Sequence, residues 1–218
     1  MAKKYGDKHC KACHINQAVP AEPTATAHPE LYVKKIATPL SEVEKAGLGR
    51  MQHFSKEGDG YYKEQSTKPQ TIGYSLNDSP IGLLAWIYEK LHDWSDGYAW
   101  TDDEILTWVS IYYFSEAGPA ATSRIYYEVE HSNPGAFLAA QAYVDVPLGI
   151  ARFSKDLVLL PKLWNQTLGP IVYQSDYDNG GHFAAYERPD AIVHDLRAMF
   201  GKDGGAYGCV SGRYGYSG

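Results

Sequence analysis

The tightest constraint on the fold comes from residues 170–200, where a strand-like run leads through two glycines into an amphipathic helix. The run PIVYQSDY is rich in β-branched and aromatic residues, which favour a strand. Gly180 and Gly181 then permit a sharp turn, and Pro189 stands where a first helical turn tolerates proline. His182 is therefore predicted to lie in a strand-to-helix loop, where α/β proteins often carry catalytic groups. A lone histidine in such a loop could also serve only to satisfy local hydrogen bonds.

A second strand is predicted upstream, within VDVPLGIARFSKDLVLLP at 144–161. Its charged interruption, SKD, places Asp156 just beyond the expected end of the strand. A carboxylate at that point could orient a histidine on the loop of the next strand. It could equally cap a helix that follows, so this residue alone does not decide between the two functions.

The middle of the chain is predicted to be helical. SEVE at 41–44 has the form of a capping box and begins one helix. Further helices are expected over residues 79–94, 101–114 and 117–131. Glycines within 57–74 are expected to break the first helix and to leave Tyr61 and Tyr62 on a turn, from which a phenol could reach a cavity. The aromatic stripes of these helices are typical of an ordinary core, so they indicate a helical subdomain rather than a site.

The first 30 residues are predicted to contain a short buried strand, KHCKACHI at 8–15, and a connection at 17–30 that leads to a different region. CKACH also matches the C-x-x-C-H pattern of c-type haem attachment, and Cys10 and Cys13 could serve as zinc ligands or a redox dithiol. Structural zinc wants four ligands, so a strand that carries two thiols is the preferred interpretation. A haem or redox protein built on Cys10, Cys13 and His14 is the alternative.

The composition of the chain limits its partners and location. It has 26 acidic and 20 basic residues, a net charge of −6 and no basic stripe with interleaved aromatics, so we expect no nucleic-acid partner. No apolar run approaches about 20 residues and no signal peptide is evident, which predicts no membrane segment and a cytoplasmic location. An odd number of cysteines, three, indicates free thiols in a reducing compartment rather than a set of disulfides. The 18 tyrosines and 5 tryptophans are compatible with an apolar pocket lined by aromatic side chains. The glycine-dense residues 201–218 are expected to form a mobile tail.

Several blocks of the sequence together resemble one family. GGHFAAYERPD, ARFSKDLVLLP, GYSLNDSPIGLLAWIYEKL and SRIYYE closely resemble the epoxide hydrolases of the α/β-hydrolase fold, specifically the microsomal-like branch common in fungi. The similarity extends from about residue 5 to residue 212. It implies an α/β chain with a truncated α/β-hydrolase fold, mainly a helical cap plus about three remaining strands. Residues 1–29 would be a remnant of the hydrolase core, residues 30–145 the cap, and residues 146–218 the C-terminal core segment with its tail.

The resemblance also implies roles for individual residues. The family's histidine falls on His182 as general base, and the acid that orients it falls on Asp156. Here Ser154 replaces the family's proline, and aspartate replaces glutamate. The two cap tyrosines that hydrogen-bond the epoxide oxygen fall on Tyr61 and Tyr126. Each is followed by another tyrosine, which leaves these two assignments open by one residue.

The implied reaction needs these residue types. A carboxylate opens a small apolar epoxide, and water activated by a neutral imidazole then hydrolyses the resulting alkyl ester to a vicinal diol. Two phenols with pKa values near 10 can donate hydrogen bonds to the alkoxide oxygen as it forms. No metal or organic cofactor is implied, and the physiological setting would be detoxification or secondary metabolism.

Two parts of the family's machinery have no counterpart among the 218 residues: the nucleophilic aspartate of a G-G-D-W-G-like segment and the H-G-x-P oxyanion motif. Asp7 precedes the first predicted strand, which is the wrong place for that nucleophile. Loss of a covalent nucleophile costs on the order of a millionfold in turnover, so we expect the chain alone to be inactive. Exposed sheet surfaces could associate with a chain that supplies the missing strands. The alternative is a non-catalytic remnant that binds an apolar ligand or another protein and needs that missing half.

Overall fold

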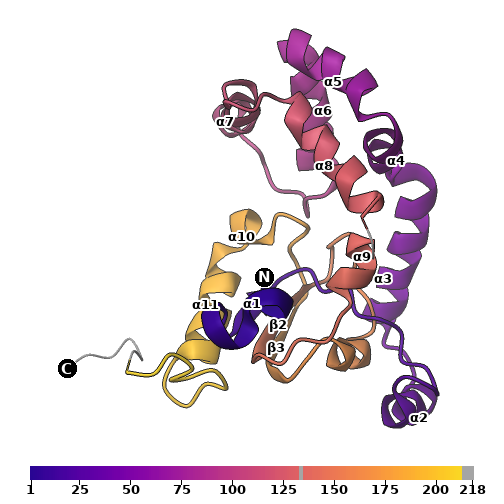
Figure 1. Ribbon diagram of the computed structural model, residues 1–218, viewed down its shortest axis with the longest axis vertical. Helices are drawn as coiled ribbons and strands as arrows, with labels where there is room; N and C mark the ends of the chain where they lie inside the picture. Colours follow the sequence, from indigo (N-terminus) through magenta and orange to yellow (C-terminus); the bar gives the residue numbers. More distant parts are fainter. Residues whose placement is uncertain (133–134, 213–218) are drawn as a thin grey trace. The chain divides into compact units, whose positions relative to one another are not determined.

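A computed structural model describes residues 1–132 and 135–212 of the chain. The chain divides into two compact units, drawn in Figure 1: a sheet unit of Met1–Met51 and Ala140–Gly218, and a helical unit of Gln52–Ala139. The helical unit lies inside the range predicted for the cap, while residues 30–51 and 140–145 of that range group with the sheet. The division into hydrolase core and cap stays a prediction.

The described residues form short helices and three strands. In chain order they are α1 (Ala2–His9), β1 (Cys13–Ile15), α2 (Pro29–Ala37), α3 (Glu42–His53), the π-helix η1 (Phe54–Gly58), α4 (Gly60–Thr67), α5 (Pro69–Asp78), α6 (Pro80–Asp93), α7 (Asp102–Tyr113), α8 (Ala120–Glu130), α9 (Ala136–Ala140), β2 (Leu148–Phe153), the 3-10 helix η2 (Lys162–Thr167), β3 (Ile171–Tyr177), α10 (Ala184–Glu187) and α11 (Pro189–Phe200).

Within the described residues the three strands form one parallel sheet in the order β1-β2-β3. Cys13 pairs with Leu148 and Leu148 with Ile171, and after a one-residue shift Gly149 pairs with Tyr173. All six residues of the central strand β2 are buried, as expected for a parallel strand with neighbours on both edges. α11 contacts β2 and β3 and lies beside them in Figure 1.

Apolar clusters on the two faces of β2 hold the sheet unit together. One contains Leu148, Ile150 and Leu168. The other contains Phe153, Ala151, Ala184 and Ala191, and so joins β2 to α10 and α11. Full burial of a side chain such as Phe153 is worth roughly 1.5–3 kcal/mol. This second cluster therefore fixes the segment after β3 against the end of β2.

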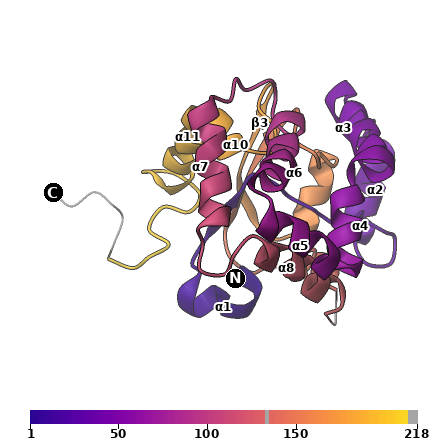
Figure 2. The ribbon, with the colours of Figure 1, turned by 90° about the horizontal axis from the view of Figure 1, so that it is seen from above.

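Two helices of the helical unit, α6 and α7, begin where the sequence predicts. Ser79 Oγ accepts a hydrogen bond from Gly82 N–H (3.0 Å) at the start of α6. Thr101 and Glu104 form a reciprocal capping box at the start of α7. Contacts join α4 and α5 to α8 and join α6 to α7. Figure 2 shows α5 beside α6 and α8. The core of this unit includes Leu76, Leu83 and Val109.

Tyr61 and Tyr62 are helical, so the turn predicted for them is wrong. α3 continues into η1, and α4 begins at Gly60, so the glycines mark joints between helices rather than an open turn. Tyrosine has a middling helix propensity, which leaves the outcome to tertiary packing. Here α4 packs against α5 and α8.

The strand predicted at 8–15 is shorter than expected. α1 extends to His9, and its last turn is closed by Cys10 N–H, which donates to the carbonyls of Tyr5 (3.2 Å) and Gly6 (3.1 Å). The strand β1 begins only at Cys13. The N–H of Cys10 is thus already used by a helix and is not available to a sheet ladder.

Residues 201–212 pack on the sheet unit, whereas we expected a mobile tail. Ala206 is buried, and its N–H donates to Met199 O (2.9 Å). A Cβ at Gly205 would lie 2.6 Å from Cβ of Val172, so only glycine allows the chain to approach β3 this closely. Glycine density therefore reflects close packing here. Residues 213–218 of the predicted tail lie outside the described residues.

Candidate active site

The loop that carries His182 follows β3 and turns tightly over the end of β2. Gly180 has φ +100°, and a Cβ there would lie 2.6 Å from Cδ1 of Phe153. Both conditions favour glycine. The carbonyl of Gly180 also accepts a hydrogen bond from Lys155 N–H (3.2 Å). The loop after β3 and the turn after β2 are thereby tied together.

His182 and Asp156 come together as the sequence predicts. His182 Nδ1 lies 3.1 Å from Asp156 Oδ1, with Asp156 1% exposed and the His182 side chain 24% exposed. Because a carboxylate accepts, the contact calls for the tautomer with Nδ1–H and assigns proton exchange to Nε2. The alternative in which Asp156 caps a helix is wrong. Its carboxylate accepts from Leu157 N–H (2.7 Å), and no helix begins there within the described residues.

Arg50 supports the turn that carries the acid. From α3 it donates through a terminal nitrogen to the carbonyl of Ser154 and through Nε to the carbonyl of Asp156 (3.4 Å). The N–H of Ser154 donates in turn to Tyr177 O (2.9 Å), at the end of β3. Sequence reasoning missed Arg50, because an arginine on a helix gives no signal that it will bind a turn about one hundred residues away.

Tyr61 and Tyr126 meet within the helical unit. Their ring centroids lie 5.9 Å apart and the rings are nearly perpendicular, with Tyr61 on α4 and Tyr126 on α8. Burial raises the pKa of Tyr61 to about 12, and burial also raises the pKa of Tyr126. Both phenols therefore keep their protons at neutral pH and can donate hydrogen bonds.

The neighbours of these tyrosines have different surroundings. The hydroxyl of Tyr62 donates to Glu130 Oε2, and the ring of Tyr127 stacks on His131 with centroids 4.0 Å apart. Tyr62 and Tyr127 thus have partners outside the Tyr61–Tyr126 pair. The structure thus forms two pairs: Tyr61 with Tyr126 in the helical unit, and His182 with Asp156 in the sheet unit.

In the segment with Cys10, Cys13 and His14, the histidine lies near a buried carboxylate and Cys13 packs against the core of the sheet unit. All three cysteines of the chain, including Cys209, are free. His14 Nε2 lies 3.4 Å from Asp195 Oδ2. Burial, and then the charge of Cys10, raise the pKa of the Cys13 thiol, which disfavours the reactive thiolate. Across residues 1–132 and 135–212, no group of three or more His, Cys, Asp or Glu side chains is arranged to hold a metal ion.

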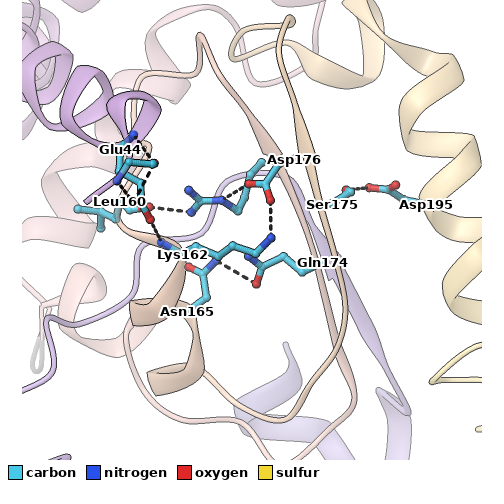
Figure 3. Close-up of polar contacts among 10 residues, drawn as sticks. Glu44, Leu160, Lys162, Asn165, Gln174, Ser175, Asp176 and Asp195 are labelled. Carbon is cyan, nitrogen blue, oxygen red and sulfur yellow. Dashed lines mark hydrogen bonds and ion pairs between the residues drawn. The ribbon is translucent and has the colours of Figure 1, made fainter. Parts of the chain in front are cut away.

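A cavity of about 1010 Å³ lies on the face of the sheet that carries Arg152 and Asp176. Figure 3 shows Asp176 pointing to this face and Ser175 pointing to Asp195 on the other, as strand alternation requires. Arg152 Nε donates to Asp176 Oδ1 (2.7 Å), and Lys162 pairs with the same carboxylate. Burial raises the pKa of Asp176, but hydrogen bonds from Lys162 and Arg152 outweigh it and leave the pKa lowered.

This cavity is not the candidate site, despite its size. Its described lining includes neither His182 nor Asp156. Both of its basic side chains, Arg152 and Lys162, form ion pairs with Asp176. We therefore place the site at the loops that end β2 and β3, where the acid and the base meet.

In the described part of the chain, no helix is long and apolar enough to cross a membrane.

The order of acid and base along the chain identifies the class. An acid follows one parallel strand, a histidine follows the next, and a helical insertion separates β1 from β2. This order, acid before histidine at the carboxyl ends of neighbouring strands, is that of the α/β-hydrolases.

Comparisons with known proteins name the family. No family model matches the chain. It is 38% identical over 179 residues to a Stigmatella aurantiaca protein named as an epoxide hydrolase, covering 79% of this chain and 39% of that protein. It is 35% identical over 158 residues to epoxide hydrolase 1 of Sus scrofa, covering 65% of this chain and 34% of that protein.

Solved structures agree with these relatives. The structure of Aspergillus niger epoxide hydrolase matches with a TM-score of 0.69 and 38% identity, covering 89% of this chain and 46% of that one. Juvenile hormone epoxide hydrolase of the silkworm Bombyx mori matches with a TM-score of 0.73 and 28% identity, covering 87% and 48%. The chain belongs to the epoxide hydrolase family of the α/β-hydrolase fold. It aligns with the C-terminal part of these relatives and spans less than half of their length.

Proposed function

We propose that this chain supplies the acid–base pair and the epoxide-binding tyrosines of an epoxide hydrolase, which converts an epoxide and water to a vicinal diol. The observation that carries the proposal is the 3.1 Å contact between His182 Nδ1 and the buried Asp156. Family membership supports the reaction class. A small apolar epoxide as substrate, a cytoplasmic location and a role in detoxification belong to the same proposal.

His182 acts in the second half of the proposed reaction. The first half leaves an alkyl ester between an enzyme carboxylate and the opened substrate. Nε2 of His182 takes a proton from water, the water oxygen attacks the ester carbonyl, and the bond from that carbon to the alkyl oxygen breaks. The diol leaves with the proton, and the carboxylate is restored. Asp156 stabilises the imidazolium formed on the way, because its negative charge faces Nδ1.

Tyr61 and Tyr126 act in the first half. Attack on an epoxide carbon breaks a carbon–oxygen bond and leaves the electron pair on oxygen, where negative charge develops. A phenol with its pKa raised to about 12, as burial does for Tyr61, stays protonated and donates a hydrogen bond to that oxygen. Burial also raises the pKa of Tyr126, and the ring centroids of the two tyrosines lie 5.9 Å apart, which supports a shared role as donors.

The attacking carboxylate is proposed to come from sequence outside these 218 residues, which contain neither the G-G-D-W-G-like segment nor the H-G-x-P motif. The chain by itself therefore does not turn over epoxides, since removing a covalent nucleophile costs on the order of a millionfold. Exposed surfaces of the sheet unit would meet the part of the protein that supplies it.

The test compares the chain alone with a chimera in which residues 1–212 replace the matching C-terminal part of the A. niger enzyme. Diol formation from styrene oxide is measured by chromatography. We expect background turnover from the chain alone and enzymatic turnover from the chimera. In the His182→Gln chimera the alkyl ester should accumulate and appear as a mass increase of one substrate on the intact protein.

Three outcomes contradict the proposal. Rapid turnover by the chain alone would rule out an external nucleophile. A His182→Gln chimera that folds and hydrolyses styrene oxide at the unsubstituted rate would rule out His182 as base. A folded chimera with no turnover and no adduct, while the chain still associates with the N-terminal half of the relative, would favour the non-catalytic binding remnant.

A further inference from the structure

Glu187 holds the backbone on both sides of His182. Its Oε2 accepts a hydrogen bond from Gly181 N–H, and its Oε1 accepts one from Phe183 N–H, both at 3.1 Å. Gly181 is buried, so its N–H requires a protein acceptor. Phe183 is the N-cap residue of α10 and has no polar side chain with which to cap it. The Glu187 carboxylate takes the place of that cap and joins both ends of the three-residue segment to one planar group.

We propose that Glu187 is a positioning residue for His182, which keeps the imidazole directed at Asp156. This inference rests on the proposed function, because it treats His182 as the base. The contact between His182 Nδ1 and Asp156 Oδ1 is already 3.1 Å long, so a further displacement of about half an ångström would end it as a hydrogen bond. The loop begins at Gly180, whose backbone is intrinsically permissive, so the carboxylate supplies the restraint that the glycines do not.

Charge gives the two contacts their strength. Hydrogen bonds from N–H groups to a carboxylate are about twice as strong as those between neutral groups. A glutamine at 187 keeps one acceptor oxygen but turns an NH₂ group toward one of the two N–H donors. Glu187→Gln therefore releases one end of the segment and leaves the side-chain volume unchanged.

The first experiment follows the hydrogen-bonded Nδ1 proton of His182 by NMR in the 218-residue chain, assigned by its loss in His182→Gln. In Glu187→Gln we expect this proton to exchange with water at least tenfold faster or to vanish. The matched control is Asp190→Asn, which removes the same charge three residues later from a carboxylate that binds Arg188 instead of the loop. If Glu187→Gln does not fold, Glu187→Asp keeps the charge but is one methylene too short to reach both N–H groups.

An unchanged Nδ1 signal in a folded Glu187→Gln or Glu187→Asp chain would overturn the inference. The chimera gives a second measurement. When ester hydrolysis limits kcat, Glu187→Gln should lower kcat by about 10- to 100-fold, because small misplacements of a catalytic group cost on that order. The ratio kcat/KM, which reports epoxide opening, should stay within about twofold.

The two proposals fail separately. A merely structural role for Glu187 would reduce the folded fraction and lower kcat and kcat/KM equally, and that result would overturn the positioning role. Absence of a trapped ester in the folded His182→Gln chimera would instead overturn the proposed function. The NMR result in the chain does not depend on turnover, so it still reports whether Glu187 holds His182 on Asp156.

Discussion

Replacement of Asp195 tests how α11, which follows the histidine loop, is held against the sheet. Asp195 is fully buried on α11 and faces β3. Its Oδ1 accepts hydrogen bonds from the hydroxyls of Tyr173 (3.0 Å) and Tyr177, and its Oδ2 accepts one from Ser175 Oγ. One carboxylate therefore joins three alternate residues of β3 to the helix, and Figure 3 shows its contact with Ser175.

The expected costs follow from the number of bonds and their charge. Asp195→Ala removes the acceptor for all three hydroxyls, although Tyr177 OH also lies 3.2 Å from Ala191 O and keeps that partner. A buried hydroxyl that loses its acceptor costs about 1–3 kcal/mol, and the residues that donate here are only half-buried, so we expect a loss of about 2–3 kcal/mol in the free energy of unfolding. Asp195→Asn keeps one acceptor oxygen and offers an NH₂ to Ser175 Oγ, so its expected cost is about 1–2 kcal/mol.

The measurement is urea unfolding of the 218-residue chain, followed by near-ultraviolet circular dichroism of its tyrosines. Asp190→Asn is the control, because its carboxylate lies at the surface, where it forms an ion pair with Arg188 and accepts from backbone N–H groups; we expect little change there. A loss below about 1 kcal/mol for Asp195→Ala would refute the reasoning, since it would mean that water replaces the carboxylate freely. If Asp195→Asn and Asp195→Ala lower the free energy of unfolding equally, the charge of Asp195 matters and the number of acceptor oxygens does not.

Three further predictions concern titration and backbone strain. Burial lowers the pKa of His14 despite the opposing effect of Asp195. The contribution of neutral His14 to the free energy of unfolding should therefore be complete above pH 6.5 and be lost as the pH falls below it. In urea unfolding, His14→Gln should reduce this dependence of stability on pH. Because burial raises the pKa of Tyr61 to about 12, its contribution to stability should be complete below pH 10 and be lost as the pH rises toward 12. Tyr62 and Tyr177 also have pKa values raised to about 12, so a spectrophotometric titration of Tyr61→Phe should keep the late step but reduce its amplitude by one tyrosine. Gly180→Ala should lower stability by about 2 kcal/mol or more, whereas Gly97→Ala, with φ +68° but no atom near its Cβ, should cost less by thermal unfolding.

Elements with a local chemical signal could be predicted from the sequence. Ser79 with Pro80 and Thr101 with Glu104 define helix starts through their own side chains, and both caps are present. The contact between His182 and Asp156 was one of two alternatives that the sequence left open for this aspartate, and the structure contains it. The carboxyl ends of parallel strands meet at one edge of a sheet, so even a separation of 26 positions in the chain becomes a hydrogen bond.

Features that depend on distant packing could not be predicted in this way. Tyr61 is helical because α4 packs on α8, and no residue near Tyr61 in the sequence predicts that contact. Arg50 binds the turn around Asp156 from a helix far away in the sequence. Gly205 belongs to a segment predicted to be mobile because it is rich in glycine, yet this glycine allows the chain to pack closely against Val172. In each case the deciding partner lies in another part of the chain, where propensity and periodicity carry no information.

Glu187 is close to His182 in the sequence, yet its role could not be predicted from a local signal. It is only five residues from His182, but a glutamate in a short helix has many possible partners, so its spacing alone did not single it out. Every restraint described for the acid–base pair, from Gly180 to Glu187 and Arg50, belongs to the sheet unit, while the two phenols belong to the helical unit. Since the proposed ester hydrolysis uses the first pair and epoxide opening the second, substitutions in the sheet unit should slow the ester step and leave opening intact. Substitutions around Tyr61 and Tyr126 should do the reverse, so the kinetic step affected reports which of the two units has been disturbed.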